Sequence, residues 1–521
     1  MRNNQCVDYL IIGAGPGGLQ FGYELGQQGL RYLILEAGDG PGTFFQTFPR
    51  HRRLISVNKV HTGESNPLLN LRWDWNSLLT RGQEHLFKNY STEYYPPAAD
   101  MLRYLDDYAR ELQINVQYET TVRRIHRTDR FTLYDQHDNV YTAERLVIAT
   151  GLSTPYVPSI PGIEHAELYP TFSVDPTDFI DQRVLIIGKA NSAFETADNL
   201  IPVAATIHMC SPHPVSLAWR THFVGHLRST NNDFLDTYQL KLQNGVLDAE
   251  IDNIQKVDGC YRVDITYTHA MEEQRTIVYD RILLCTGFRF DDSSFDDSCH
   301  PELTINKRFP NQTHEWESAN VEDMYFAGTL MQARDYKKTM SAFVHGFRYN
   351  VKALATIFAI KYHAGHWPHR LLSSRPDVVT AETMCRINTS SSLFLQPGYF
   401  CDLLRVSPLR EQIEYYEDLP VDYVLGGTLS IDADCFLLTL EYGDFKSVRD
   451  PFAIDRNPSK PETTEYLHPI VRRYVGRELA SIHHVAEDLE NVYEGEKFSA
   501  PLREYFAQNL ASGSRLTESW H

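Results

Sequence analysis

The stretch YLIIGAGPGG, residues 9–18, is an apolar run that ends in a glycine-rich turn. In such a turn Gly13 permits the tight bend, Gly15 lets the backbone approach a pyrophosphate, and Gly18 lets the next helix pack closely on the strand. The helix would begin at Pro16, with its N-terminus facing the phosphates. The stretch therefore predicts the first strand, turn and helix of a dinucleotide-binding fold.

The residues after this turn complete the expected unit. Residues 31–36 read as a second strand, which gives the order strand, helix, strand. Glu36 ends that strand eighteen residues after Gly18, where an acid accepts hydrogen bonds from ribose hydroxyls, and Ala37 follows it. We expect a permanently bound dinucleotide here, and FAD suits that role.

A second, looser version of the turn occurs at VLIIGKANSA, residues 184–193. It keeps Gly188 but has Ala190 and Ala193 where the first turn has glycines, so a pyrophosphate would lie farther from the backbone. A dinucleotide that leaves in every cycle suits such a site. We therefore expect a nicotinamide cofactor, which would supply the hydride that FAD accepts.

The strand after the second turn ends without an acid, which favours NADPH over NADH. Its end reads HMCSPH, residues 208–213. An acid would repel a 2′-phosphate, whereas Ser211, His213 or Lys189 could contact one. The alternative is that these are ordinary loop residues, because the arginine that best holds a phosphate is missing. NADH stays open as the second option.

Two short passages, ERLVIATG at residues 144–151 and DRILLCTG at 280–287, repeat each other and bracket the second turn. We expect them to be the crossovers between two domains. The predicted fold class is α/β, with two Rossmann-like dinucleotide-binding domains, the NADP domain inserted in the FAD domain, and a C-terminal α+β extension. The predicted domains are residues 1–151 and 287–360 for FAD, 152–286 for NAD(P), and 361–521 for a C-terminal domain of unknown role.

Composition excludes several classes of partner. The chain has 49 basic and 68 acidic residues, and its formal charge of −19 argues against nucleic acid and anionic membranes. No apolar run approaches the roughly 18 residues of a membrane helix. The apolar stretch near the N-terminus is too short for a signal peptide and leads directly into the first turn, so we expect a cytoplasmic protein. A homo-oligomer is compatible with all of these features.

The eight cysteines are widely scattered, with no C-x-x-C pair and no His/Cys spacing typical of a metal site. We therefore expect neither a dithiol redox centre nor a bound metal.

Several long stretches resemble known flavoproteins. The two-dinucleotide plan, the ATG and CTG exits and the stretch NSA after the second turn resemble the flavin-containing and N-hydroxylating monooxygenases. FPRHRRLISVNK (48–59), GKANSAFETA (188–197) and FVHGFRYNVKAL (343–354) are similar to a closer family, that of FAD-dependent oxidoreductase domain-containing protein 2, an endoplasmic-reticulum flavoprotein family implicated in protein degradation. One monooxygenase fingerprint, F-x-G-x-x-x-H ahead of the second turn, is absent, and residues 165–176 read HAELYPTFSVDP instead.

The resemblance implies an NADPH-dependent flavoprotein monooxygenase. NADPH would reduce FAD, O₂ would add to give a C4a-hydroperoxyflavin, and one oxygen atom would pass to a small amine, sulfur or carbonyl substrate. The alternative is an FAD-dependent reductase or a flavin-stabilised protein-interaction factor whose C-terminal third recognises a partner. A third hypothesis is that FAD is purely structural.

Asn58 is the first catalytic candidate that the resemblance implies. It lies in LISVNK, similar to the segment where monooxygenases place a flavin-facing asparagine, and its amide could donate to a peroxide or to bound nicotinamide. An ordinary turn residue is the alternative. Asp335 and His345 are further catalytic candidates, while Trp73 and Trp75 are candidates for the pocket or for the core.

The predicted cofactor-binding residues come from the two turns, from the strand exits that follow them, and from the matching stretches. They are Gly13, Gly15, Pro16, Gly18, Glu36, Ala37, Asn58, Ala149, Thr150, Gly151, Gly188, Asn191, Ser192, Ala193, Ser211, His213, Thr286, Gly287, Gly328 and Arg348. Arg348 could instead sit in a surface ion pair, and His345 could be a structural histidine.

Overall fold

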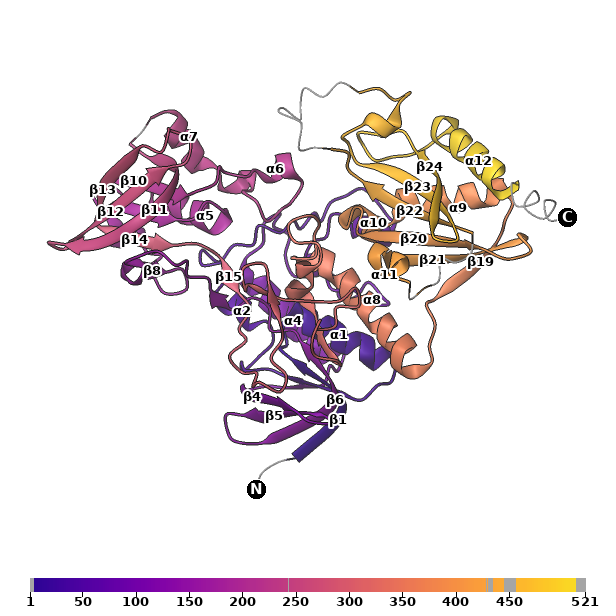
Figure 1. Ribbon diagram of the computed structural model, residues 1–521, viewed down its shortest axis with the longest axis horizontal. Coiled ribbons are helices and arrows are strands. Elements are labelled where there is room, and N and C mark those ends of the chain that lie inside the picture. Colours follow the sequence, from indigo (N-terminus) through magenta and orange to yellow (C-terminus); the bar gives the residue numbers. More distant parts are fainter. Residues whose placement is uncertain (1–3, 242, 428, 430–433, 445–455, 512–521) are drawn as a thin grey trace.

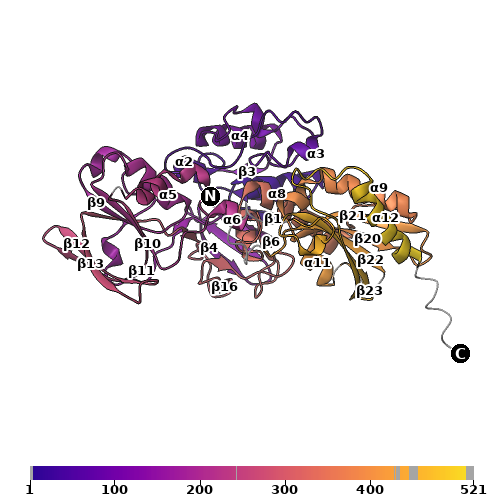
Figure 2. The ribbon, with the colours of Figure 1, turned by 90° about the horizontal axis from the view of Figure 1, so that it is seen from above.

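The computed structural model places three lobes around three separate β-sheets (Figure 1). The first lobe holds both the N-terminal strand and a strand near residue 325, the second lobe holds the inserted segment, and the third is C-terminal. Seen from above, the first lobe lies between the other two (Figure 2). The structure describes residues 4–241, 243–427, 429, 434–444 and 456–511.

The first sheet has the strand order β3-β2-β1-β6-β5-β4, and β18 adds to β6. Strands β1, β2, β3, β6 and β18 run parallel and are rich in buried aliphatic residues, as expected for strands covered on both faces. The strands are β1 (Asn4–Ile12), β2 (Tyr32–Leu35), β3 (Val116–Gln117), β4 (Val122–Arg127), β5 (Phe131–Asp135), β6 (Val140–Ile148) and β18 (Met324–Phe326).

Helices α1 (Pro16–Gln27) and α8 (Val344–His363) pack against each other in this lobe. The segment between β2 and β3 is a long excursion that includes α2 (Thr43–Thr47), α3 (Pro67–Asn70), the 3-10 helix η1 (Phe87–Asn89) and α4 (Ala98–Glu111). Two short elements, η5 (Gly328–Ala333) and the hairpin β16 (Leu303–Thr304) and β17 (Phe309–Pro310), also belong here.

The second sheet has the order β13-β12-β11-β10-β9-β14-β8. Its strands are β8 (Glu167–Leu168), β9 (Arg183–Ile187), β10 (Thr206–Ser211), β11 (Gly245–Val257), β12 (Cys260–Tyr267), β13 (Gln274–Tyr279) and β14 (Arg281–Leu284). Its helices are η2 (Ile163–His165), η3 (Pro176–Phe179), α5 (Asn191–Leu200), α6 (Ala218–Thr221), η4 (Ser229–Asn231) and α7 (Asp233–Gln239).

The two crossings between these lobes lie side by side. Strand β7 (Thr154–Pro155) leaves the first lobe and pairs antiparallel with β15 (Phe288–Arg289), which returns to it. The repeated passages 144–151 and 280–287 contain β6 and β14, so each is a strand that ends at a crossing. The second lobe is therefore an insertion in the first.

The third lobe is a six-stranded antiparallel sheet of order β19-β21-β20-β22-β23-β24. Its strands are β19 (His369–Ser373), β20 (Phe400–Val406), β21 (Gln412–Pro420), β22 (Cys435–Glu441), β23 (His468–Val475) and β24 (Glu478–His484). Its helices are α9 (Pro376–Thr389), α10 (Ser391–Leu395), α11 (Val421–Leu425), η7 (Pro461–Thr463) and α12 (Glu496–Ala511).

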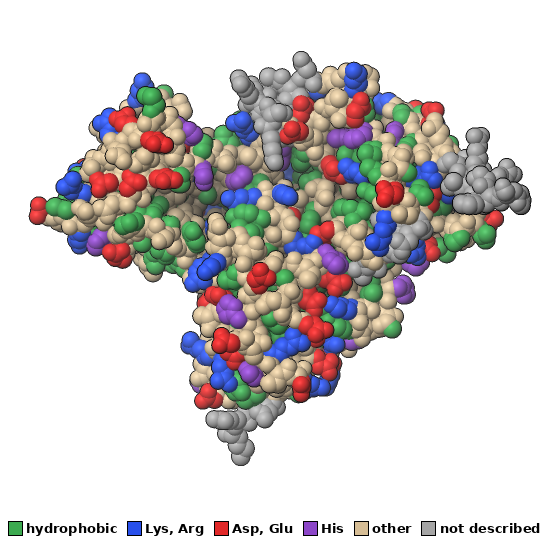
Figure 3. Space-filling model, in the orientation of Figure 1, with side chains coloured by type: hydrophobic (Ala, Val, Ile, Leu, Met, Phe, Trp, Pro, Cys, Tyr) green, Lys and Arg blue, Asp and Glu red, His purple; other side chains and the backbone are tan. Residues whose placement is uncertain are grey.

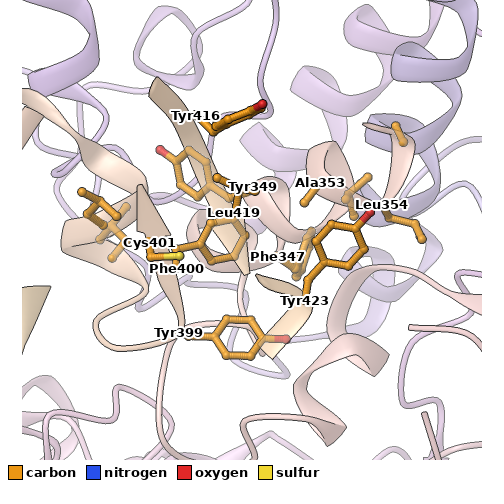
Figure 4. Close-up of a cluster of buried hydrophobic side chains, with 14 of the residues drawn as sticks. Phe347, Tyr349, Ala353, Leu354, Tyr399, Phe400, Cys401, Tyr416, Leu419 and Tyr423 are labelled. Carbon is orange, nitrogen blue, oxygen red and sulfur yellow. The ribbon is translucent and has the colours of Figure 1, made fainter. Parts of the chain in front are cut away.

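Helix α8 joins the first lobe to the third. Figure 4 shows Phe347, Tyr349 and Leu354 of α8 in one buried cluster with Phe400 and Leu419 of the C-terminal sheet. A helix that is apolar on most of its faces has to be covered on most of its faces, and α8 is covered by α1 and by this sheet.

The expected fold class is confirmed: two Rossmann-like sheets, one inserted in the other, and a mixed C-terminal extension. The boundaries at residues 151, 286 and 360 stay predictions, and parts of 361–521 lie outside the described residues. We call the lobes the first nucleotide domain, the second nucleotide domain and the C-terminal domain. No helix in the described ranges is both long enough and apolar enough to cross a bilayer.

Candidate active site

The three glycines of the first turn differ in what surrounds them. Gly13 has φ +102°, and a Cβ there would lie 2.8 Å from the Ala149 carbonyl oxygen. A Cβ on Gly18 would lie 2.0 Å from the Gly13 carbonyl oxygen. Around Gly15, by contrast, no atom of the described chain other than those of Gly15 and its two neighbours in sequence lies within 4 Å of such a Cβ. Protein packing thus requires Gly13 and Gly18, while Gly15 faces open space that a ligand can occupy.

That open space belongs to a cavity of about 560 Å³ beside the turn. Its size is that of a cofactor site. Of the predicted cofactor residues, those that line it are Gly13, Gly15, Glu36, Ala37, Ala149 and Thr150. Its other wall was not predicted from the sequence. It includes Thr43, Phe44 and Phe48 of the excursion, Thr120 between β3 and β4, and Phe290 and Phe295 after the insertion.

Glu36 is held in this cavity by three donors. One carboxylate oxygen accepts from the Ala14 N–H at 2.6 Å, and the other accepts from the Gly38 N–H at 2.9 Å and from the Thr43 hydroxyl at 2.7 Å. A carboxylate has about four acceptor positions, so one is left for a ribose hydroxyl. Glu36 is thus held with an acceptor position free, and its contact with a ribose stays a prediction.

Three helices begin near the strand ends without a side-chain cap. Helix α1 starts after Gly15, α5 after Ala190 and α8 after Phe343, and none has a capping side chain. Helices α3 and α10, by contrast, are capped by Asn66 and Ser390. Uncapped first turns leave backbone N–H groups for phosphate or carbonyl oxygens of a ligand.

The segment that follows β18 packs against the first turn and its helix. A Cβ on Gly17 would lie 2.5 Å from the Gly328 Cα, so the end of β18 touches α1 directly. After Gly328, the Thr329 hydroxyl donates to the Ala342 carbonyl, just ahead of α8. The start of α8 is thereby fixed at the same sheet edge as the glycine turn.

The second turn repeats the packing of the first. Gly188 has φ +130°, and a Cβ there would lie 2.3 Å from the Cys285 carbonyl oxygen. The exit Cys285-Thr286-Gly287 is held in turn by the Thr286 hydroxyl, which donates to the Tyr156 carbonyl. Gly188 is therefore required by its own neighbours, as Gly13 is by Ala149.

Two predicted residues of the second turn have structural partners instead. The Lys189 side chain is 3% exposed, forms an ion pair with Asp248 and donates to the Leu247 carbonyl at 2.9 Å. The expected contact of Lys189 with a 2′-phosphate is therefore wrong, because its ammonium is already paired within the protein. Ala193 is buried in the core of α5. Of the other phosphate candidates, the Ser211 hydroxyl donates to the His213 carbonyl at 3.2 Å and His213 is exposed.

Asn191 anchors the loop that follows α6, and Ser192 follows it in the first turn of α5. The Asn191 amide donates to the His226 carbonyl at 2.7 Å and accepts from the Arg228 N–H at 2.9 Å. The role of Asn191 is thus to shape the loop that reaches the first nucleotide domain.

The two nucleotide domains hold each other through reciprocal arginines. Arg50 of the first domain donates to the Phe172 carbonyl of the second at 2.6 Å and also to the Pro170 carbonyl. Arg228 of the second domain donates to the Ile55 carbonyl of the first at 3.0 Å. These contacts fix the orientation of the two domains, and we call them the arginine latch.

Next to the latch lies a ladder of stacked side chains. The Arg228 guanidinium lies 5.2 Å from the centre of the Trp75 ring, which stacks on His345 at 4.4 Å. His345 stacks on Phe343 at 5.8 Å, and Phe343 meets Phe223 of the second domain at 5.8 Å. The ladder closes the interface between the domains with flat, water-excluding surfaces.

His345 is the buried centre of this ladder. It is 1% exposed, and neither ring nitrogen makes a hydrogen bond of good geometry with the described residues. Burial lowers the pKa of His345 well below 6.5, Arg348 and Arg228 add to that effect, and the Trp75 backbone partly offsets it. The imidazole is therefore neutral, and its nitrogens can serve a bound ligand.

The expected donor role of Asn58 is corrected by its hydrogen bonds. Its amide group donates to the Ser91 carbonyl at 2.8 Å and to the Glu93 carbonyl at 3.1 Å. Both N–H bonds are thus used, and the two carbonyl partners also settle which end of the amide faces them. Asn58 fixes the fold of the excursion, and a contact with a cofactor could use only its oxygen.

Arg348 and Trp73 also have other surroundings than expected. Arg348 is fully buried and donates to the carbonyls of Leu71, Asp74 and Ser77, each at 2.8–2.9 Å. It therefore supports the excursion. Its contact with a cofactor stays a prediction that these hydrogen bonds do not favour. Trp73 is 36% exposed and therefore lies at the surface, whereas Trp75 belongs to the ladder.

The cysteines and possible metal ligands can be stated for the described residues. All eight cysteines are free there, and none of them lines the cavity beside the first turn. Over the same ranges no three His, Cys, Asp or Glu side chains are grouped so as to hold a metal ion.

Comparison with known proteins identifies the family. The family model described as pyridine nucleotide-disulphide oxidoreductase matches residues 10–328, which span both nucleotide domains. The chain belongs to this family. Within it, FAD-dependent oxidoreductase domain-containing protein 2 of Mus musculus is 35% identical over 508 residues, covering 90% of this chain and 76% of the relative. The resemblance seen in the sequence is thereby confirmed.

Solved structures show that the fold of this family carries more than one reaction. A flavin-containing monooxygenase from Stenotrophomonas maltophilia superposes with a TM-score of 0.52 at 21% identity, covering 68% of this chain and 99% of that one. Bacillithiol disulfide reductase Bdr (YpdA) from Staphylococcus aureus gives a TM-score of 0.51 at 20% identity, covering 69% and 100%. The shared fold alone does not choose between oxygenation and disulfide reduction.

Asp335, the last catalytic candidate, is a buried acid. It is 3% exposed, one oxygen accepts from the Thr339 hydroxyl, and the other makes no hydrogen bond of good geometry with the described residues. Burial raises the pKa of Asp335 from 3.8 to about 6, against the opposing hydrogen bonds of Thr339 and Ser341. Its proton is thus held more tightly in the folded protein than in the unfolded chain.

This pKa predicts how stability depends on pH. Because the folded pKa lies above the unfolded one, the contribution of Asp335 to stability falls as pH rises from about 4 to about 6 and is level above that. We expect Asp335→Asn to raise the free energy of unfolding by about 1–3 kcal/mol near neutral pH, and by much less at about pH 4. Urea unfolding at both pH values tests this, with the exposed Asp377→Asn as control. An equal effect at both pH values would contradict it.

Proposed function

We propose that the protein is an NADPH-dependent flavoprotein monooxygenase that oxygenates a small amine, sulfur or carbonyl compound. FAD would lie in the cavity of the first turn, with its pyrophosphate at Gly15 and the start of α1, and its ribose at Glu36. Bound FAD would supply the two-electron acceptor and, once reduced, the reaction with O₂. NADPH, H⁺, O₂ and substrate would give NADP⁺, water and the oxygenated product.

The second turn suits the hydride donor. Gly188 and the uncapped start of α5 would receive the pyrophosphate of NADPH. On the face drawn in Figure 3, Lys, Arg and His side chains gather between the two upper lobes of this acidic chain. Burial and, to a smaller extent, the charge of Lys337 lower the pKa of His226. The loop that holds His226 in the second nucleotide domain therefore lies close to the loop that holds Lys337 in the first. Such positive charge favours a donor with an extra phosphate.

The arginine latch and the aromatic ladder support the oxygenase reaction over a reductase. Oxygenation requires that the reduced site be kept from water while O₂ and substrate react, because otherwise hydrogen peroxide is released. Arg50, Arg228 and the stack through His345 hold the two domains in contact and cover their interface. Their role would be to keep the nicotinamide and the site in place through the reaction.

The position of the cysteines is the observation that carries the choice between the two reactions. A reductase that passes electrons to a disulfide within its own chain needs a thiol pair beside the flavin. Among the described residues no cysteine lines the first cavity, and Cys285 of the second domain is fully buried behind Gly188.

The test is the fate of the oxygen atoms. The FAD-loaded protein is supplied with NADPH, or with NADH in parallel, and with ¹⁸O₂ and a panel of amines, thioethers and ketones. We expect faster flavin reduction by NADPH, one labelled oxygen in the product of at least one compound, and a peroxide yield that falls in proportion. Release of a full equivalent of peroxide with every compound, and no label in any product, would reject the oxygenase reaction and leave the flavoprotein assignment standing.

A further inference from the structure

Three cavities adjoin one another between the first nucleotide domain and the C-terminal domain, away from both turns. The middle one measures about 480 Å³ and shares Leu71 and Leu79 with a cavity of about 180 Å³ inside the excursion. On its other side it shares Tyr349, Lys352 and Asp418 with a cavity of about 250 Å³. None of the residues lining these three cavities lines the cavity of the first turn. We call them together the interdomain cavity.

The wall of the middle cavity carries opposite charges that form few close ion pairs with the described residues. Glu24 of α1 accepts one hydrogen bond, from the Gln20 amide at 3.0 Å, and forms no ion pair with any described residue. Arg81 of the excursion is exposed and likewise has no ion pair within the described ranges. Among the described residues, the Lys352 ammonium forms one ion pair, with Asp418 at 3.9 Å. Burial raises the pKa of Glu24, and the charges of Lys352 and Arg81 and the hydrogen bond from Gln20 offset only part of that effect.

The C-terminal domain completes this cavity with groups that are already satisfied. A bulge in β21, opposite Asp402, sets Asp418 at φ +58°. From there its carboxylate accepts from Arg386 at 2.8 Å and from the Ser392 hydroxyl. In the middle cavity, the charges left for a ligand are therefore the Glu24 carboxylate on one side and the Arg81 and Lys352 cations on the other.

A ligand that matches this wall carries both charges and an apolar part. Its ammonium group would meet Glu24, its carboxylate would meet Lys352 and Arg81, and its side chain would lie against Leu71 and Leu79. The volume of the cavity falls within the range of sites for small molecules. We propose that the interdomain cavity is a binding site for an apolar α-amino acid, separate from both nucleotide sites.

Calorimetric titration of the FAD-loaded full chain with L-leucine tests the site. N-acetyl-L-leucine lacks the ammonium charge and L-leucinamide lacks the carboxylate, so we expect each to bind at least about tenfold more weakly than L-leucine. Glu24→Gln and Lys352→Met should each weaken L-leucine binding by about tenfold or more, because each removes one charge of the pair. The matched controls Glu490→Gln and Lys307→Met, at exposed positions outside the cavity, should bind as the unmodified protein does.

Thermal midpoints and FAD content of every variant show whether it is folded. The proposal is overturned if L-leucine, L-methionine and L-phenylalanine give no binding heat, if the two derivatives bind as well as L-leucine, or if folded Glu24→Gln binds it unchanged. Since Glu24 and Lys352 touch neither turn, these outcomes leave the proposed monooxygenase function unaffected.

Discussion

Gly15→Val is expected to give a folded protein that has lost its flavin. Gly15 has φ −73° and ψ 179°, an extended conformation open to any residue, and no atom of the described chain other than those of Gly15 and its two neighbours in sequence lies within 4 Å of the added Cβ. The branched side chain would instead fill the space where the pyrophosphate approaches. We expect the FAD content and the FAD affinity to fall at least about tenfold, while the thermal midpoint of the apoprotein is unchanged. The ratio of flavin to protein absorbance measures the first effect.

Two other glycines serve as controls for this result. Gly40 also has open space around it but does not line the cavity, so Gly40→Val should keep both fold and flavin. Gly18→Val should fail to fold correctly, because its Cβ would lie 2.0 Å from the Gly13 carbonyl oxygen. A folded Gly15→Val protein with full FAD content would show that the first turn does not hold the cofactor.

Arg386→Met should cause the largest loss of stability in the C-terminal domain. The buried Arg386 guanidinium donates to Asp402 at 2.6 and 3.0 Å and to Asp418 at 2.8 Å, and it lies 3.3 Å from Glu417. Its removal leaves the fully buried Asp402 without a cation, which costs about 3–5 kcal/mol, whereas Glu417 keeps its ion pair with Arg370. Hydrogen exchange of the β20 and β21 amides, followed by mass spectrometry, should show the corresponding increase in opening.

The loss should come from the unpaired acid rather than from the missing side chain. Asp402→Asn added to Arg386→Met should therefore recover part of it, since a buried carboxylate is replaced by a neutral amide. The exposed pair of Arg375 and Asp377 provides the contrast, because Arg375→Met should change stability by less than about 1 kcal/mol. Unchanged exchange in Arg386→Met would mean that this cluster does not hold the sheet together.

The parts of the fold that the sequence predicted are those encoded by neighbouring residues. The turn at Gly13 and the acid at Glu36 carry their meaning within about thirty residues, the length of a strand–helix–strand unit. The passages 144–151 and 280–287 are each short and local, and their repetition in the sequence marks the two crossings. Strand and helix periodicity and glycine stereochemistry act over that range, so these features could be read without coordinates.

The corrected roles depend on partners far along the chain. Lys189 forms an ion pair with Asp248 of β11, so its ammonium is not available to a phosphate. The Asn58 amide donates both of its N–H bonds to the carbonyls of Ser91 and Glu93, so it has none for a cofactor. No spacing rule connects such pairs, because the crossovers decide which strand ends meet. The interdomain cavity is the extreme case, since Glu24 and Asp418 come from opposite ends of the chain.

The insertion sets an order on how the chain can mature during synthesis. The first sheet needs β18, and its helix layer needs α8, yet both follow the whole second nucleotide domain in the sequence. Because the ribosome releases the chain from its N-terminus, all strands of the second nucleotide domain are synthesised before the last strand of the first nucleotide domain. Until β18 is made, the N-terminal part of the first nucleotide domain has unpaired backbone groups along β6. During that time a chaperone, or FAD that binds before synthesis is complete, would protect this edge from pairing with another chain.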